Sequence, residues 1–94
     1  MTKKQQITCY CVNYASFSND NYNLYSEERL TTDLNEARKY LEAYLKGVQE
    51  EKDMAGVEYD IRREERGTDT EISVSSSDDT YSYYSIRLTK HKLN

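Results

Sequence analysis

The stretch 34-LNEARKYLEAYLKGVQEEK-52 decides the fold of this chain, because it is the one long segment with a clear helical repeat. Its apolar residues recur at spacings of three and four: Leu34, Ala37, Leu41, Tyr44, Leu45 and Val48. The spacing predicts an amphipathic helix over about residues 34–52, capped by Thr32 or Asp33 with Glu36 as a capping-box partner, and Gly56 ending the connection that follows. One face of this helix requires a sheet to cover it.

Residues 5–14 precede the helix with a period-two pattern in which Ile7 and Cys9 alternate with Tyr10 and Val12. Neither set is strongly polar, so this segment is expected to be a strand in the interior of a sheet. Residues 16–23 are rich in Ser, Asn and Asp, which favour turns. Residues 22–26 have the composition of a short returning strand, without a pattern that requires one.

After the helix, three strand patterns follow in close succession. Val57, Tyr59 and Ile61 alternate with polar residues and predict a half-buried strand, residues 67–70 a turn, residues 71–75 a second strand, and residues 76–80 another turn. The last strand is expected over residues 81–90. The sequence thus predicts an α+β fold in one small domain spanning residues 1–94, with one helix packed on an antiparallel sheet of about four strands in the order β-α-β-β-β.

One helix covers only one face of a sheet, so the other face stays bare. The strand patterns place on it Tyr81, Tyr83, Arg87, Arg62, Asp60, Glu64, Ser73 and Ser75. Tyrosine and arginine are enriched in protein interfaces, although tyrosine is also a good strand residue in its own right. The candidate protein-binding residues are Tyr81, Tyr83, Arg87 and Arg62 on this face, and Asp78 and Asp79 in the adjoining turn.

Composition excludes several classes of function. The chain has a net charge of -4, a pI of about 5.0 and a mean hydropathy of -1.01, which disfavour a general phosphate-binding surface and a membrane span. Cys9, Cys11 and His91 are too few for a structural zinc site, so no metal and no cofactor is expected. No phosphate loop or nucleophile motif occurs, so an enzyme is not expected. Two cysteines without a disulfide framework, and no signal-peptide pattern in residues 1–6, predict a cytoplasmic protein.

The sequence therefore favours a non-enzymatic binding module whose partner is a larger protein or a protein–nucleic-acid complex. By analogy of size and charge, the concrete expectation is an inhibitor of the anti-defence type made by phages and mobile elements, such as an anti-CRISPR. Two alternatives stay open. One is nucleic-acid binding by the aromatic face together with Lys3, Lys4, Lys90 and Lys92 near the termini. The other is a structural homodimer that buries the bare face or pairs edge strands.

Overall fold

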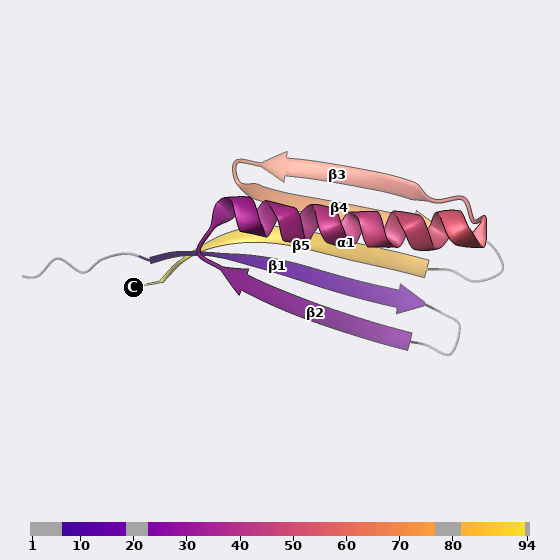
Figure 1. The fold of residues 1–94 in the computed structure, drawn as a ribbon, viewed down its shortest axis with the longest axis horizontal. Helices are drawn as coiled ribbons and strands as arrows, with labels where there is room; N and C mark the ends of the chain where they lie inside the picture. Colours follow the sequence, from indigo (N-terminus) through magenta and orange to yellow (C-terminus); the bar gives the residue numbers. More distant parts are fainter. Residues whose placement is uncertain (1–6, 19–22, 77–81, 94) are drawn as a thin grey trace, which may run out of the picture.

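The computed structural model describes residues 7–18, 23–76 and 82–93. Five antiparallel strands form one sheet in the order β2-β1-β5-β4-β3, and one helix lies across one of its faces (Figure 1). The elements are β1 (Ile7–Ser18), β2 (Asn23–Thr31), α1 (Leu34–Ala55), β3 (Asp60–Arg66), β4 (Asp69–Ser76) and β5 (Ser82–Leu93). The predicted α+β fold of one helix on an antiparallel sheet is confirmed, with five strands in place of about four. No helix in the described ranges is both long enough and apolar enough to cross a membrane.

The additional strand is β2, which makes the element order β-β-α-β-β-β. The short returning strand expected over residues 22–26 is a nine-residue strand that continues to Thr31 and pairs with β1 along its whole length, from Ser18 opposite Asn23 to Tyr10 opposite Thr31. The prediction was too short because β2 lies at an edge and most of its described side chains are exposed, so its sequence carries no buried alternation.

The first and last strands meet at the centre of the sheet. β1 and β5 pair in register from Ile7 opposite Leu93 to Ser18 opposite Ser82. The expectation that the first strand is interior is confirmed, because β1 lies between β2 and β5. Val12 and Leu88 are opposite each other and fully buried, which shows that this side of both strands faces α1.

The helix begins and ends at well-defined caps. Asp33 is the N-cap, and its Oδ1 accepts hydrogen bonds from the backbone N–H of Asn35 at 2.9 Å and of Glu36 at 3.4 Å. The expected capping-box contact is replaced, because the N–H of Asp33 donates to Thr31 Oγ1 at 3.1 Å while Glu36 accepts a hydrogen bond from Tyr40. The helix runs to Ala55, beyond the expected Lys52, and Gly56 caps it in the left-handed conformation at φ 68°.

The core lies between α1 and the central strands. Its buried residues are Val12, Ala37, Leu41, Leu45, Val48, Ile72, Val74, Tyr84, Ile86 and Leu88. Tyrosines enlarge this small aliphatic core, because Tyr84 belongs to it and Tyr14 and Tyr44 pack against it. The rings of Tyr14 and Tyr44 stack with centroids 4.9 Å apart, and the Lys52 ammonium lies 5.1 Å from the centroid of Tyr84.

The prediction of a half-buried strand over Val57, Tyr59 and Ile61 is correct only in part: a strand follows the helix and Val57 and Tyr59 are half-buried, but they precede the strand, which is itself exposed. β3 begins at Asp60, and every one of its residues is exposed, including Ile61 at 38%. The reason is that β3 is the outermost strand, beyond the part of the sheet that the apolar face of α1 covers. The turn that follows is also shorter than expected, because β4 already begins at Asp69.

Two glycines in and after α1 give opposite predictions for stability. Gly47 lies inside the helix and Gly56 at its C-cap, and a Cβ added at either position meets no atom within 4 Å. We expect Gly47→Ala to raise the free energy of unfolding by about 1 kcal/mol through helix propensity. Gly56→Ala should lower it by about 1 kcal/mol, because alanine disfavours a positive φ. Urea unfolding followed by circular dichroism measures both, and a change of the same sign in the two variants would contradict this assignment of the helix end.

Candidate functional site

The uncovered face of the sheet, called the open face below, carries the side chains that alternate with the core residues. On its β3, β4 and β5 side they include Asp60, Arg62, Glu64, Arg66, Asp69, Glu71, Ser73, Ser75, Tyr83, Ser85, Arg87 and Thr89. The β3–β4 and β4–β5 registers bring residues from distant parts of the chain into rows across the strands. One row contains Glu64, Glu71 and Arg87, and the next contains Arg62, Ser73 and Ser85.

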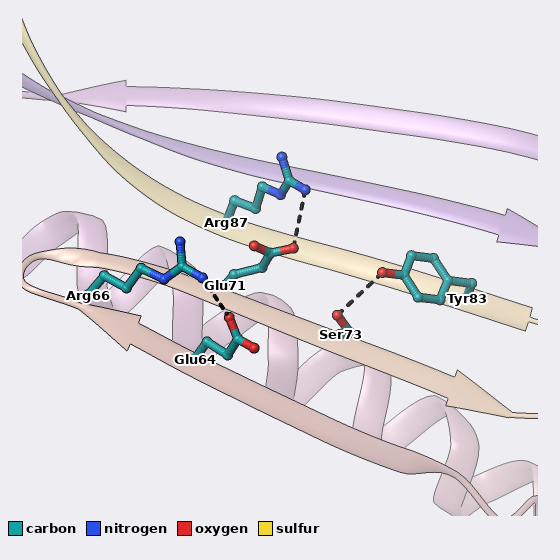
Figure 2. A network of polar contacts seen from close by, with 6 residues as sticks. All are labelled: Glu64, Arg66, Glu71, Ser73, Tyr83 and Arg87. Carbon is teal, nitrogen blue, oxygen red and sulfur yellow. Dashed lines mark hydrogen bonds and ion pairs between the residues drawn. The ribbon is translucent and has the colours of Figure 1, made fainter.

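Polar contacts between neighbouring strands fix part of this face (Figure 2). Arg87 Nη2 lies 3.1 Å from Glu71 Oε1, so the guanidinium of β5 is paired with the carboxylate opposite it on β4. The Tyr83 hydroxyl donates a hydrogen bond to Ser73 Oγ at 3.3 Å across the same two strands. Glu64 and Arg66 pair within β3 at 3.4 Å. Tyr83 and Arg87 are therefore held in defined orientations.

Arg62 differs from the other two arginines of this group. Within the part of the chain that the structure describes, its guanidinium forms no hydrogen bond or ion pair, whereas Arg66 and Arg87 each have a carboxylate partner. Its side chain lines an open hollow of about 510 Å³ together with Asp60, Ile61, Ser73, Ser75 and Tyr83. The hollow thus presents a free cation beside an aromatic ring and small hydroxyl side chains.

The structure brings together three of the six predicted site residues. Arg62, Tyr83 and Arg87 all lie on the open face, as the strand patterns indicated, and Arg62 and Tyr83 line the same hollow. Tyr81, Asp78 and Asp79 lie outside the described residues, so their assignment stays a prediction.

The sequence did not indicate a second cluster, on the helix side of the sheet. There β2 presents Tyr25, Glu27 and Arg29 to Tyr40 and Tyr44 of α1. Arg29 Nε donates to the Tyr44 hydroxyl at 3.1 Å, and its guanidinium lies 5.1 Å from the Tyr40 centroid. The hydrogen bond from Tyr25, 2.9 Å long, lowers the pKa of the Glu27 carboxyl. Alternation places Tyr25, Glu27 and Arg29 on one face of β2, and the pairing of β2 with β1 brings that face beside α1. Tyr40 and Tyr44 of α1 pack against the core.

The cysteines and the histidine gather at one end of β1 and β5. Cys9 is directly opposite His91 in the register, and Thr89 Oγ1 lies 2.9 Å from His91 Nε2. Both cysteines are free thiols. Burial raises the pKa of the Cys11 thiol, with the nearby Glu28 carboxylate adding to the effect, so this thiol is a poor nucleophile near neutral pH. Among the residues described, no three His, Cys, Asp or Glu side chains are placed to hold a metal ion.

Comparisons of the chain with protein-family models, with curated proteins and with solved structures give no match.

The two thiols should differ in reactivity. Cys11 is buried and its pKa is raised, whereas Cys9 is only partly buried. In the variant Cys9→Ala, which retains Cys11, we expect slow reaction with a disulfide reagent at pH 8 and a rate that continues to rise above pH 9, because only the thiolate reacts. The variant Cys11→Ala, which retains Cys9, should react several-fold faster at pH 8. Equal rates at pH 8 would contradict the burial of Cys11.

Proposed function

We propose that this chain is a non-enzymatic protein-binding module that presents the open face of its sheet to a larger protein. The observation that carries the proposal is the free guanidinium of Arg62 beside Tyr83 in an open hollow. Arginine and tyrosine are enriched among the residues that contribute most to binding energy at protein interfaces. A guanidinium without a partner among the described residues has its donors available for carboxylate or carbonyl oxygens of a bound protein.

The arrangement of Tyr83 supports the same proposal. Its hydroxyl is held by Ser73 and its ring is partly exposed, so the side chain loses little conformational entropy when a partner packs against it. Arg87 is held in place by Glu71 and remains exposed. A binding surface of fixed side chains around one free cation favours a specific contact over a general electrostatic one.

Charge balance favours a protein partner over nucleic acid. On the β3, β4 and β5 side of the open face, four carboxylates (Asp60, Glu64, Asp69 and Glu71) accompany three guanidinium groups (Arg62, Arg66 and Arg87). Affinity for a phosphate backbone requires an excess of positive charge, which this group lacks. Of the lysines on which the nucleic-acid alternative depends, the structure describes Lys90 and Lys92, which lie at the end of β5.

In its concrete form, we propose a small cytoplasmic inhibitor or modulator of a larger protein or nucleic-acid enzyme, of the anti-defence type made by phages and mobile elements. The support is the small size, the net charge of -4 and the free thiols, which suit a reducing compartment. The decisive experiment is affinity capture from host lysate with and without nuclease. A stoichiometric protein that remains bound after nuclease treatment supports the proposal, and recovery of nucleic acid alone contradicts it.

Substitutions in the hollow test which residues make the contact. We expect Arg62→Ala and Tyr83→Ala each to weaken binding to the captured partner by on the order of 1 to 3 kcal/mol. Arg87→Ala should weaken it by less, because the Arg87 guanidinium is already paired with Glu71. Titration calorimetry with the purified partner measures the change. The matched control is Arg38→Ala, an exposed arginine on α1 in the other layer, which should bind as the unaltered chain does. Wild-type affinity in both hollow variants would refute the open face as the interface.

The predicted acidic turn has a separate test. If Asp78 and Asp79 contribute to a contact, the double variant Asp78→Asn with Asp79→Asn should slow association with the partner at low salt, because exposed charges mainly steer the encounter. Stopped-flow or surface-based kinetics at two salt concentrations measures this. An association rate equal to that of the unaltered chain at low salt would remove the turn from the interface.

A further inference from the structure

The two edges of the sheet are chemically different. β2 and β3 are the outermost strands, and each leaves the backbone groups of its outer side without a neighbouring strand within the described residues. Six of the seven residues of β3 are charged, which protects that edge against pairing with another strand. Only three of the nine residues of β2 are charged, namely Glu27, Glu28 and Arg29 at its middle. Figure 1 places β2 at the rim of the sheet on the opposite side from β3.

The less protected edge also carries exposed apolar side chains. Leu24 is 77% exposed, Leu30 is 64% exposed and Tyr25 is 55% exposed. Leu24 and Leu30 lie on the open face, opposite Phe17 and Cys11 of β1. Two leucines on one face of one edge strand cannot bury each other, since they are about 20 Å apart along the strand. A second strand beside β2 would cover both.

We propose that β2 pairs antiparallel with β2 of a second copy of this chain, joining the two sheets edge to edge around a twofold axis at Glu27. Glu27 is the central residue of the nine, so pairing over the full strand has a single register. That register sets Leu24 opposite the partner's Leu30, and Leu30 opposite the partner's Leu24. On the other face it sets Tyr25 opposite the partner's Arg29, and Arg29 opposite the partner's Tyr25.

Each of these pairs is favourable across antiparallel strands. Directly opposed side chains have Cβ atoms about 4.5 to 5.5 Å apart, close enough for the leucines to cover each other and for a guanidinium to contact a tyrosine ring. A register centred on Glu28 would set Leu30 against the partner's Ser26 and leave Leu24 beyond the end of the pairing. The apolar residues of β2 are therefore matched to each other only in the full-length register.

The twofold axis places Glu27 opposite the partner's Glu27, which is unfavourable for two bare carboxylates. In this chain the charge is already compensated. Arg29 Nη2 lies 3.5 Å from one Glu27 oxygen, and the Tyr25 hydroxyl donates to the other at 2.9 Å. The central pair is thus two internally neutralised carboxylates.

This association is independent of the proposed function, because the Arg62 hollow lies on β3, β4 and β5 and the proposed contact on β2. Sedimentation equilibrium at about 100 µM should give twice the 11.1 kDa mass of one chain. The double variant Leu24→Glu with Leu30→Glu should sediment as a monomer with an unchanged circular dichroism spectrum, because both side chains are exposed in the single chain. The matched control Ile61→Glu, an exposed apolar residue on the charged edge, should remain a dimer. A monomeric unaltered chain, or a dimer that the leucine substitutions leave intact, would overturn the proposal.

Cross-linking tests the register itself. In a background with Cys9→Ala and Cys11→Ala, Glu27→Cys lies opposite its own copy and should form a disulfide-linked dimer on mild oxidation, since directly opposed strand residues meet the Cα spacing of a disulfide. Glu28→Cys in the same background lies opposite the partner's Ser26 and should remain largely uncrosslinked. Efficient cross-linking at position 28 without cross-linking at position 27 would refute the full-length register.

Discussion

The antiparallel pairing of β1 with β5 is the interaction on which the rest of the structure depends. It joins the first and last described strands over twelve residue pairs, and it connects two pieces that are otherwise separate, the β1–β2 hairpin and the β3–β4–β5 meander. It also places Val12 beside Leu88 and Tyr14 beside Ile86, so that α1 finds one continuous apolar surface. Because the two strands are far apart in sequence, this pairing requires a large loop-closure entropy, and burial under α1 provides the compensating free energy.

The parts of the fold that could be predicted are those with a buried face. The helix was evident because Leu41, Leu45 and Val48 repeat with its period, and β4 and β5 because Ile72, Val74, Ile86 and Leu88 alternate with polar residues. β2 and β3 were assigned too short or too buried for a common reason. Edge strands satisfy their backbone on one side only and need no buried side chains, so alternation in their sequence says little about their length or exposure.

The sequence was sufficient to predict which face of the sheet carries the candidate site, but not which of its side chains form ion pairs with one another. Alternation was sufficient to place Arg62, Tyr83 and Arg87 opposite the core, since a strand residue and the residue two positions away share a face. It could not show that Arg87 pairs with Glu71 while Arg62 is unpaired, because that depends on the strand register.

The roles of the tyrosines could not be predicted from composition. Composition alone suggested an aromatic binding surface, but Tyr14, Tyr44 and Tyr84 contribute to packing under and around α1, and of the tyrosines predicted on the open face only Tyr83 lies within the described residues.

A sheet with one covered face leaves two kinds of surface available, a face and an edge, and here the Arg62 hollow on the face and the β2 edge lie on opposite sides of β1. Edge pairing around a twofold axis perpendicular to the sheet would keep both open faces on the same side of the dimer. The two Arg62 hollows would then point in one direction, held apart by the rigid sheets between them. Such an arrangement would raise the effective concentration of the second hollow once the first is occupied, which strengthens binding only to a target that presents its binding site twice at a matching distance. The dimer would also add stability to a domain in which every ion pair between described residues joins partly exposed side chains and therefore contributes little.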